Sequence, residues 1–380
     1  MRRIRIAIFV MQLNTIGGGA YSVIRNWCSL LNKKQFDVHI IIVSKNPNLI
    51  IEDYKNINNI SITVIDILEL PWYSTIIIFK KLYNYLINKK IDILHTIFIQ
   101  ADILGAIAAK IARVPVLMSS VLGYLVNPLP QGSKILKIFL YKTGYSLVKN
   151  DFNKILTITN ANLIELNQIF KVTKKRLQVN YCGIKLEKSS SIKTIRKEKS
   201  IYKIGVMAEL IPSKGIDIFI KAIPEIINRC PSTKFVVAGD GPQLLILKEL
   251  AIELSIKEKI EFLGWVPNSR EVIKKMDIFV FPSLPYYDGL PRVILEAWAV
   301  GTPVVATNVA VVPEIIRSNI DGIIVKPNSS NDIAMGVCEL LSDQDKANKI
   351  AINAFKKVLD FDVIKEVETM ENIYKELLKG

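Results

Sequence analysis

The stretch "DIFVFPSLPYYDGLPRVILEAWAVGTPVVATN", residues 277–308, carries the signals that decide the fold. It opens with an apolar run, passes through a loop rich in Pro, Gly and Tyr, and continues as an amphipathic segment from Arg292. A second apolar run, "PVVATN" at 303–308, follows directly. A buried strand, a helix and another buried strand form a βαβ unit, which is typical of a parallel sheet. The stretch therefore predicts an α/β protein.

The same alternation extends through the chain on both sides of this stretch. In the first half, apolar β-branched runs predict strands at 5–11, 37–44, 60–66, 92–97 and 115–120. Amphipathic segments between them predict helices at 20–31, 76–90 and 101–113. In the second half, strands are predicted at 202–209, 234–241, 260–265, 277–283, 303–308 and 322–327. Two series of βαβ units predict two Rossmann-like, doubly wound parallel-sheet domains.

A polar, charged segment separates the two series. With 380 residues, the chain is too long for one ordinary core and fits two domains. We expect an N-terminal domain at 1–187, a linker at 188–200, a second domain at 201–360, and a C-terminal helix at 361–380 that packs back toward the first domain. The two domains are expected to face a central cleft, because ligands of such sheets bind outside the carboxyl ends of the strands.

Composition indicates a folded protein without a histidine metal site. Half of the residues are hydrophobic and 22% are charged, so disorder is excluded as a description of the whole chain. Only His39 and His95 could supply imidazole ligands. The cysteines lie far apart, which predicts reduced, buried thiols of a cytosolic protein. They are Cys28, Cys182, Cys230 and Cys338.

The N-terminal sequence "MRRIRIAIFVMQLN" has a basic head and an apolar run, so a signal peptide is one interpretation. The apolar part is short, runs into Gln12 and Asn14, and has no small-residue cleavage site. A first strand that enters a glycine turn explains it better. Nowhere does the chain reach about 18 uninterrupted apolar residues, so we expect no membrane span.

Two carboxylates bracket the turn in "DGLPRVILE", residues 288–296. Pro291 fits the first turn of the predicted helix, and Gly289 allows backbone to approach a ligand closely. The free N–H groups at this helix end suit a phosphate, while Asp288 and Glu296 could accept from hydroxyls. A nucleotide-sugar needs this combination of groups. Helix capping by solvated acids remains an equally open interpretation of the spacing.

The segment "DGLPRVILEAWAVGTPVVAT" resembles the signature of glycosyltransferase family 4, retaining enzymes of the GT-B fold, in which two carboxylates eight positions apart bracket a Gly-x-Pro turn. Further motifs occur in the family's order: "GVMAELIPSKGID" (205–217), "FVVAGDGP" (235–242), "FLGWVPN" (262–268), "FVFPS" (279–283), "VPEII" (312–316) and "DGIIVKP" (321–327). The N-terminal "NTIGGGAYSVIRN" (14–26) looks like the family's glycine-loop start. Linked motifs over roughly 200 residues make this resemblance specific.

The resemblance implies three catalytic residues. Lys214 would bind the donor diphosphate as a point charge that neutralises the leaving group. Glu296 would accept hydrogen bonds from the ribose hydroxyls, and Asp288 would hold the transferred sugar. The donor-binding residues that it implies are Gly17, Gly18, Gly19, Glu209, Lys214, Gly239, Trp265, Val266, Asp288, Gly289, Leu290, Pro291 and Glu296. Acceptor-binding residues are expected at Ser120, Gly123 and Tyr124, in the N-terminal, acceptor-binding domain.

Three positions depart from the family's pattern. Glu209 stands where the family often has an arginine beside the diphosphate, and Asp288 is one methylene shorter than the usual glutamate. Many relatives carry a histidine where this chain reads "SSVLGYLV", residues 119–126. The resemblance implies that transfer would proceed on one face of the sugar, with the leaving phosphate taking the acceptor proton, so positioning and charge screening would suffice. No metal or other cofactor is implied, and the nucleotide-sugar is a substrate.

The positive charge is confined to one half of the chain. The formal net charge is +15; residues 1–185 hold 24 Lys and Arg against 9 Asp and Glu, and the remainder holds 26 of each. An anionic membrane surface would attract this half. Segments 132–150 and 72–90 mix lysines with apolar residues, as interfacial helices do. Solvated lysines without a partner are the alternative; nucleic acid is not favoured, because no binding module is present.

Three hypotheses about the function follow from these observations. The first is a retaining glycosyltransferase that moves a hexose or N-acetylhexosamine from a UDP-sugar to a saccharide or a polyprenyl- or lipid-linked acceptor at the inner face of the membrane. The second, motivated by Glu209 and Asp288, is a catalytically weak GT-B protein that acts as a binding partner in polysaccharide assembly. The third, a nicotinamide-dependent oxidoreductase, fails because Ser22 occupies the third glycine position of the fingerprint.

Overall fold

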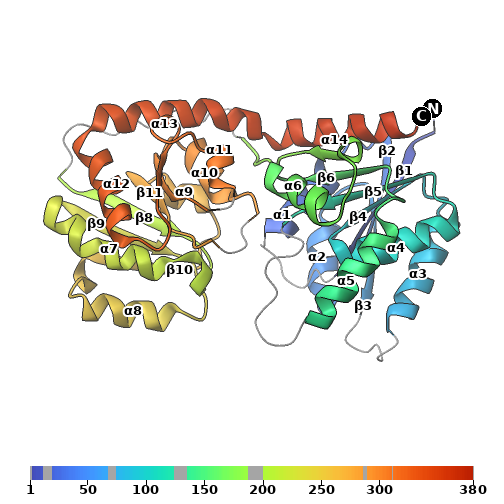
Figure 1. The fold of residues 1–380 in the computed structure, drawn as a ribbon, viewed down its shortest axis with the longest axis horizontal. Coiled ribbons are helices and arrows are strands. Elements are labelled where there is room, and N and C mark those ends of the chain that lie inside the picture. The colour runs from blue at the N-terminus through green and yellow to red at the C-terminus, as the bar shows by residue number, and fades with distance from the viewer. Residues whose placement is uncertain are drawn as a thin grey trace. The chain divides into compact units, whose positions relative to one another are not determined.

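The computed structural model describes residues 2–11, 19–66, 74–123, 135–186, 200–285, 289–309 and 311–379. The chain divides into two compact units: unit 1 holds the residues up to Gly183 and those from Val363 on, and unit 2 is Ile184–Asp362 (Figure 1). The expected boundaries at residues 187 and 360 lie a few residues away from these. Apart from Ser200, the predicted linker lies outside the described residues.

Unit 1 is built on one seven-stranded parallel sheet, in the order β3-β2-β1-β4-β5-β6-β7. Its strands are β1 (Ile4–Met11), β2 (Phe36–Ser44), β3 (Ile60–Asp66), β4 (Ile93–Ile97), β5 (Val116–Val121), β6 (Lys154–Thr157) and β7 (Leu177–Val179). Its helices are α1 (Gly19–Leu30), α2 (Pro47–Lys55), α3 (Ser74–Asn88), α4 (Ile99–Ala112), α5 (Ile135–Val148), α6 (Asn160–Ile169) and α14 (Val363–Leu377). The first apolar run is therefore strand β1, in register with β2 and β4 on either side.

Helices cover both faces of this sheet, which is why its central strands are apolar on both sides. Residues of α3, α4 and α5 pack with Phe9, Ile41 and Leu94 in one buried cluster, so these three helices share a face (Figure 1). The alternating side chains of β4 face the other way. There His95 contacts α1 and α14, which pack against each other.

A buried polar network fastens α14 to the sheet of unit 1. The imidazole of His95 lies 2.6 Å from the hydroxyl of Tyr374 and 2.7 Å from that of Ser120, and it stacks on Trp27. Burial lowers the pKa of His95 to about 3, so the ring is neutral at physiological pH. The carboxylate of Glu366 accepts from the Trp27 indole at 2.6 Å and from the Gly183 amide at 2.7 Å. Each of these polar groups is thereby satisfied without water.

Unit 2 repeats the architecture with a six-stranded parallel sheet, in the order β10-β9-β8-β11-β12-β13. Its strands are β8 (Tyr202–Met207), β9 (Thr233–Ala238), β10 (Ile260–Gly264), β11 (Ile278–Phe281), β12 (Val304–Thr307) and β13 (Ile323–Val325). Its helices are α7 (Ile216–Arg229), α8 (Leu244–Glu253), α9 (Ser269–Ile273), α10 (Arg292–Ala299), α11 (Val312–Ile315), α12 (Ser330–Ser342) and α13 (Gln344–Val358). The predicted doubly wound fold of both units is confirmed.

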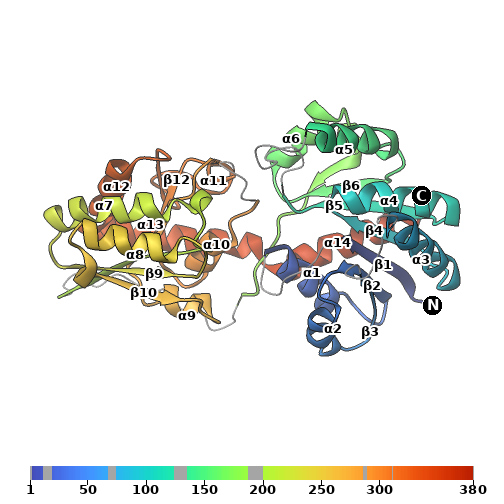
Figure 2. The ribbon, with the colours of Figure 1, turned by 90° about the horizontal axis from the view of Figure 1, so that it is seen from below.

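One core cluster joins α7, α8 and α12 to one face of this sheet, and Figure 2 shows α9 on the other side of β9 and β10. The stretch that decides the fold forms β11, α10 and β12, with β11 and β12 paired side by side. One detail of the prediction was wrong. Helix α10 begins at Arg292, so Pro291 is the residue before the first turn and not part of it. Because proline has no backbone N–H group, no hydrogen-bond acceptor is needed for it at this position.

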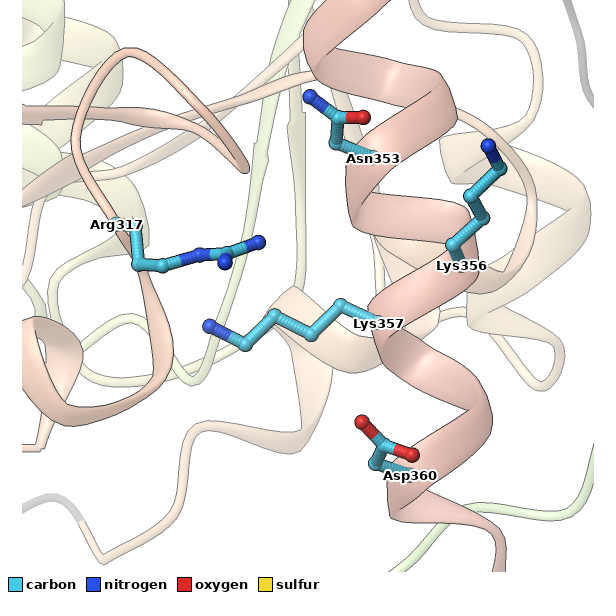
Figure 3. Close-up of a pocket in the computed structure, with 5 residues that line it drawn as sticks. All are labelled: Arg317, Asn353, Lys356, Lys357 and Asp360. Atoms are coloured by element: carbon cyan, nitrogen blue, oxygen red, sulfur yellow. The ribbon is translucent and has the colours of Figure 1, made fainter.

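A buried carboxylate locks the segment before β13 onto α13. Asp321 is fully buried and accepts two hydrogen bonds from the guanidinium of Arg317, at 2.6 and 2.7 Å, and one from Lys357 at 3.0 Å. Figure 3 shows Arg317 and Lys357 pointing toward each other beside a hollow of about 370 Å³. Because Asp321 precedes β13, the lock lies at the amino edge of the sheet. It is therefore at the edge opposite to the one where ligands are expected.

Replacing Asp321 with Asn is expected to lower the free energy of unfolding by about 1–2 kcal/mol at neutral pH, because charge-assisted hydrogen bonds are lost. Burial raises the pKa of Asp321, but the bonds from Arg317 and Lys357 outweigh it and hold that pKa below 3.8. The stabilisation is thus complete above the unfolded-state pKa and disappears as the pH falls through the folded-state pKa. Denaturant titrations at several pH values measure this. The control is Asp217→Asn, since a solvent-accessible surface pair like Asp217–Lys221 contributes less than about 1 kcal/mol.

Candidate functional site

The strand order of unit 2 reverses between β8 and β11, and open α/β sheets bind ligands at this reversal, outside the carboxyl ends of the strands. Two segments leave these strand ends: residues 208–215 follow β8, and the segment after β11 is described at residues 282–285 and 289–291. The first contains Lys214 and the second leads into α10. The predicted donor-binding segments of unit 2 therefore begin at the same point of the sheet.

The turn that carries Lys214 is fastened to the loop after β11. Pro212–Lys214 form one 3-10 turn, and Gly215 follows in the left-handed region with φ 62°. A Cβ on Gly215 would lie 2.2 Å from the carbonyl oxygen of Pro282, so only glycine fits there. The amide of Leu284 donates to the carbonyl of Ser213 at 2.9 Å. These contacts hold half-buried Lys214 beside the loop that precedes α10.

Strand β12 holds the same loop from its other side. The hydroxyl of Thr307, the last residue of β12, donates to the carbonyl of Ser283 at 2.5 Å and lies 3.2 Å from that of Phe281. Thr307 and Ser283 are both buried. The sequence interpretation missed Thr307 and the reason for Gly215. The pairs Lys-Gly before an apolar helix and Ala-Thr at a strand end are the signals that could have suggested them.

The start of α10 has features that suit an anion. Leu290 and Pro291 are buried and Gly289 is half-buried, while no side chain caps the helix and no acid occupies its first turn. Backbone N–H groups there carry the positive end of the helix dipole. Glu296 lies one turn further along and is half-buried; within the described part of the chain it has no hydrogen-bond or ion-pair partner. Asp288 lies outside the described residues.

The loops after β9 and β10 adjoin the Lys214 loop. Gly239 has φ 130°, and a Cβ on it would lie 1.8 Å from the carbonyl oxygen of Ala208, just after β8. Its amide donates to the carbonyl of Gly264 at 2.7 Å. Glu209 is exposed beside this contact, and Trp265 follows Gly264 with 73% of its surface exposed. Val266 is half-buried. The structure thus brings these predicted donor residues to one edge of the sheet of unit 2.

The predicted residues of unit 1 are only partly described. Gly17, Gly18 and Tyr124 lie outside the described residues. Gly19 begins α1, and a Cβ there would contact nothing within 4 Å. The carbonyl of Gly123 accepts from the side-chain amide of Asn162 at 3.3 Å.

The structure places Ser120 in the core of unit 1. It is buried, and its hydroxyl is engaged by His95, so its role in acceptor binding stays a prediction. The sequence interpretation missed this network, because Tyr374 lies 279 positions from His95.

Two family models match the chain. The model "Glycosyl transferase 4-like" matches residues 16–162, and "Glycosyl transferases group 1" matches residues 187–357. The chain belongs to the family 4 glycosyltransferases. The second match contains every predicted donor residue of unit 2, from Glu209 to Glu296.

Known glycosyltransferases resemble this one over nearly its whole length. An uncharacterized glycosyltransferase of Methanocaldococcus jannaschii is 29% identical over 347 residues, 85% of each chain. The UDP-Gal:alpha-D-GlcNAc-diphosphoundecaprenol alpha-1,3-galactosyltransferase of Escherichia coli is 24% identical over 98% of each chain. HepE of Anabaena, crystallised with UDP, superposes with a TM-score of 0.80 at 18% identity, over 97% of this chain and 99% of that one. The likeness to HepE supports the GT-B fold.

Three further features of this glycosyltransferase bear on the site. Within the described ranges, no three His, Cys, Asp or Glu side chains come together as metal ligands. The helices described here include none with the length and apolarity needed to cross a bilayer. None of the four cysteines, all of which lie in the described part of the chain, forms a disulfide; Cys28, Cys182 and Cys338 are buried as expected, whereas Cys230 was expected to be buried and is half-buried.

Proposed function

We propose that this enzyme is a retaining glycosyltransferase that moves a hexose or N-acetylhexosamine from a UDP-sugar to a saccharide or lipid-linked acceptor of a cell-surface polysaccharide or lipopolysaccharide. The observation that carries the proposal is the attachment of the Lys214 turn to the loop before α10, at the strand reversal of unit 2. The names of two similar proteins support the donor, since one includes UDP-Gal and the other was crystallised with UDP.

Each predicted donor residue has a role in this proposal. The ammonium of Lys214 and the N–H groups of the first turn of α10 bind the diphosphate, which carries negative charge. The carboxylate of Glu296 accepts from the ribose hydroxyls, one turn deeper along the helix. Asp288 precedes the turn and holds the transferred sugar.

The chemistry then requires little covalent help from the protein. The bond from C1 of the sugar to the phosphate oxygen breaks, and a bond from C1 to the acceptor oxygen forms on the same face. The acceptor's proton passes to the departing phosphate oxygen. Lys214 and the helix end stabilise the negative charge that develops on the diphosphate, and fixed positions for both substrates lower the entropic cost of the reaction.

Replacing Glu296 with Gln is expected to weaken UDP binding about tenfold, because a charged acceptor for two ribose hydroxyls becomes a neutral one. Calorimetric titration with UDP, GDP and ADP measures the effect and identifies the preferred base at the same time. Glu249→Gln, at an exposed position of α8, is the matched control and should leave the affinity unchanged. Equal affinities of Glu296→Gln and the wild type would show that Glu296 does not contact the ribose.

Glu209 supports a second candidate, a catalytically weak GT-B protein that acts as a binding partner in a polysaccharide-assembly complex. An exposed carboxylate at this edge repels a diphosphate, where relatives often carry an arginine. Wild-type protein that binds no nucleoside diphosphate would favour this second function. Binding of UDP together with transfer in a donor-sugar screen would exclude it.

The outer surface of α3, α4 and α5 supports a peripheral position at an anionic membrane. Ile76, Ile107, Ile111 and Leu147 are exposed on these helices, Leu147 by 78%. Exposed basic side chains on or beside α3 and α4 accompany them: Lys80, Lys81, Lys89, Lys90, Lys110 and Arg113. Apolar and basic side chains together favour the interface of an anionic bilayer. The segment around Ile138 and Tyr141, predicted to join this surface, has no described side chains.

Vesicle flotation tests this position. The full chain should float with vesicles that contain phosphatidylglycerol, and binding should fall as salt shortens the Debye length from about 10 Å at 0.1 M to about 3 Å at 1 M. Phosphatidylcholine vesicles serve as the control. No flotation with anionic vesicles at low salt would remove the membrane from the proposal and leave the soluble saccharide acceptor.

A further inference from the structure

A hollow of about 460 Å³ lies in unit 1 between α3 and strands β2 and β3. Its floor includes the apolar side chains of Ile41 and Ile65. Its rim, on α3 and directly after it, carries two cations and two amides, Lys81, Asn84, Asn88 and Lys89. An apolar floor with a cationic and amide rim fits an amphiphile whose head is anionic.

The hollow lies at the edge of the sheet, beside the helix that covers it. Helix α3 packs through Ile78, Leu82 and Leu86 into the core cluster that contains Ile41 and Ile65. Strand β3 is the edge of the sheet, so no further strand continues the floor. The rim residues of α3 recur at positions i, i+3, i+7 and i+8, which places them along one side of the helix.

The rim is positive and uncompensated. In the described part of the chain, neither Lys81 nor Lys89 forms an ion pair, and their Cα atoms are about 12 Å apart along the helix. The nearby Asp37 lies within 4 Å of Arg3 and His39 instead. The hydroxyl of Tyr85, also on the rim, is held 2.9 Å from Nδ1 of His39. The two lysines and the two amides therefore leave their donors for a ligand.

A second stripe on the same helix indicates where that ligand comes from. Ile76 is 69% exposed and Ile87 is 44% exposed on α3, and the exposed Lys80 on α3 and Lys90 just after it alternate with them in the sequence. We infer that the hollow is a headgroup subsite for one anionic phospholipid of the bilayer, with its phosphate on the lysine and asparagine rim. This inference rests on the proposed membrane position and refines it. The subsite is distinct from the donor and acceptor sites, which are expected at the carboxyl ends of the strands.

Two pairs of substitutions on one helix test the subsite. K81Q/K89Q removes the rim charges, and K80Q/K90Q removes the same charge from the outer stripe of α3. Dihexanoyl phosphatidylglycerol, below its micelle concentration, is titrated into the full chain by calorimetry. K81Q/K89Q should weaken its binding about tenfold, whereas K80Q/K90Q should change it less than about twofold. Dihexanoyl phosphatidylcholine should bind much more weakly to the wild type.

Several results would overturn the inference. If the two double variants lost the same affinity for the lipid, surface charge alone would attract it. Inorganic phosphate that binds as tightly as the lipid would show a simple anion site, and no binding of the lipid would show no site. UDP affinity serves as the independent readout, and neither pair should alter it. A protein that binds no UDP contradicts the proposed enzyme, while one that binds UDP but not the lipid contradicts only the subsite.

Discussion

Replacing Lys214 with Ala should lower kcat/KM for sugar transfer about 100- to 1000-fold, the range for removing one group that stabilises charge developing in the transition state. The turn that carries Lys214 is held at the strand reversal of unit 2 by the close approach of Gly215 to Pro282 and by the hydrogen bond from Leu284 to Ser213. In the proposed reaction, negative charge grows on the leaving diphosphate. The largest loss should therefore appear in kcat, with a smaller loss in UDP affinity.

Two controls make this result specific. Lys221→Ala, seven positions later on α7, removes an exposed lysine that pairs with half-buried Asp217 and should leave transfer unchanged. Lys214→Arg keeps the charge and should retain more activity than Lys214→Ala, although guanidinium geometry differs from that of ammonium. If transfer by Lys214→Ala matched that of the wild type with unchanged UDP affinity, the diphosphate would have to bind elsewhere.

Most of the fold could be predicted, because periodicity and strand chemistry are local properties. Runs such as those of β1 and β11 are apolar on both faces, and only a strand covered on both sides explains them. Short elements escaped prediction. The three residues of β7 and the four of β6 carry too few positions to show a pattern, and α2 begins with "PNL", which looks like a turn. Their pairing depends on neighbours distant in the sequence.

The candidate site was predictable as a set of motifs but not as a geometry. Residue types and order placed Lys214 and Glu296 in two motifs of one family, and the strand order explains why their loops share an edge. The contacts that fix the loops, Gly215 against Pro282 and Thr307 against Ser283, join residues more than 20 positions apart. Single-sequence reasoning has no means of pairing such positions. Ser120 illustrates the converse, since a hydroxyl expected at the acceptor is held by His95 in the core.

Gly215→Ala should cause the second large effect, a loss of about 3 kcal/mol in the free energy of unfolding of unit 2. An L-residue at φ 62° costs about 1 kcal/mol by itself. The new Cβ would also overlap the carbonyl oxygen of Pro282, which is backbone and cannot rotate away. The relief of this overlap separates the Lys214 turn from the loop before α10. UDP affinity should therefore fall together with stability, measured by calorimetry and by denaturant titration.

Gly264→Ala separates the two causes. Gly264 has nearly the same φ, 67°, but a Cβ there contacts nothing within 4 Å. This variant should lose only the conformational term of about 1 kcal/mol, so the difference between the two variants, about 2 kcal/mol, measures the overlap with Pro282. If Gly215→Ala and Gly264→Ala lost the same free energy of unfolding, the Gly215 turn would not depend on its contact with Pro282. The attachment that positions Lys214 beside α10 would then have to come from the Ser213–Leu284 hydrogen bond alone.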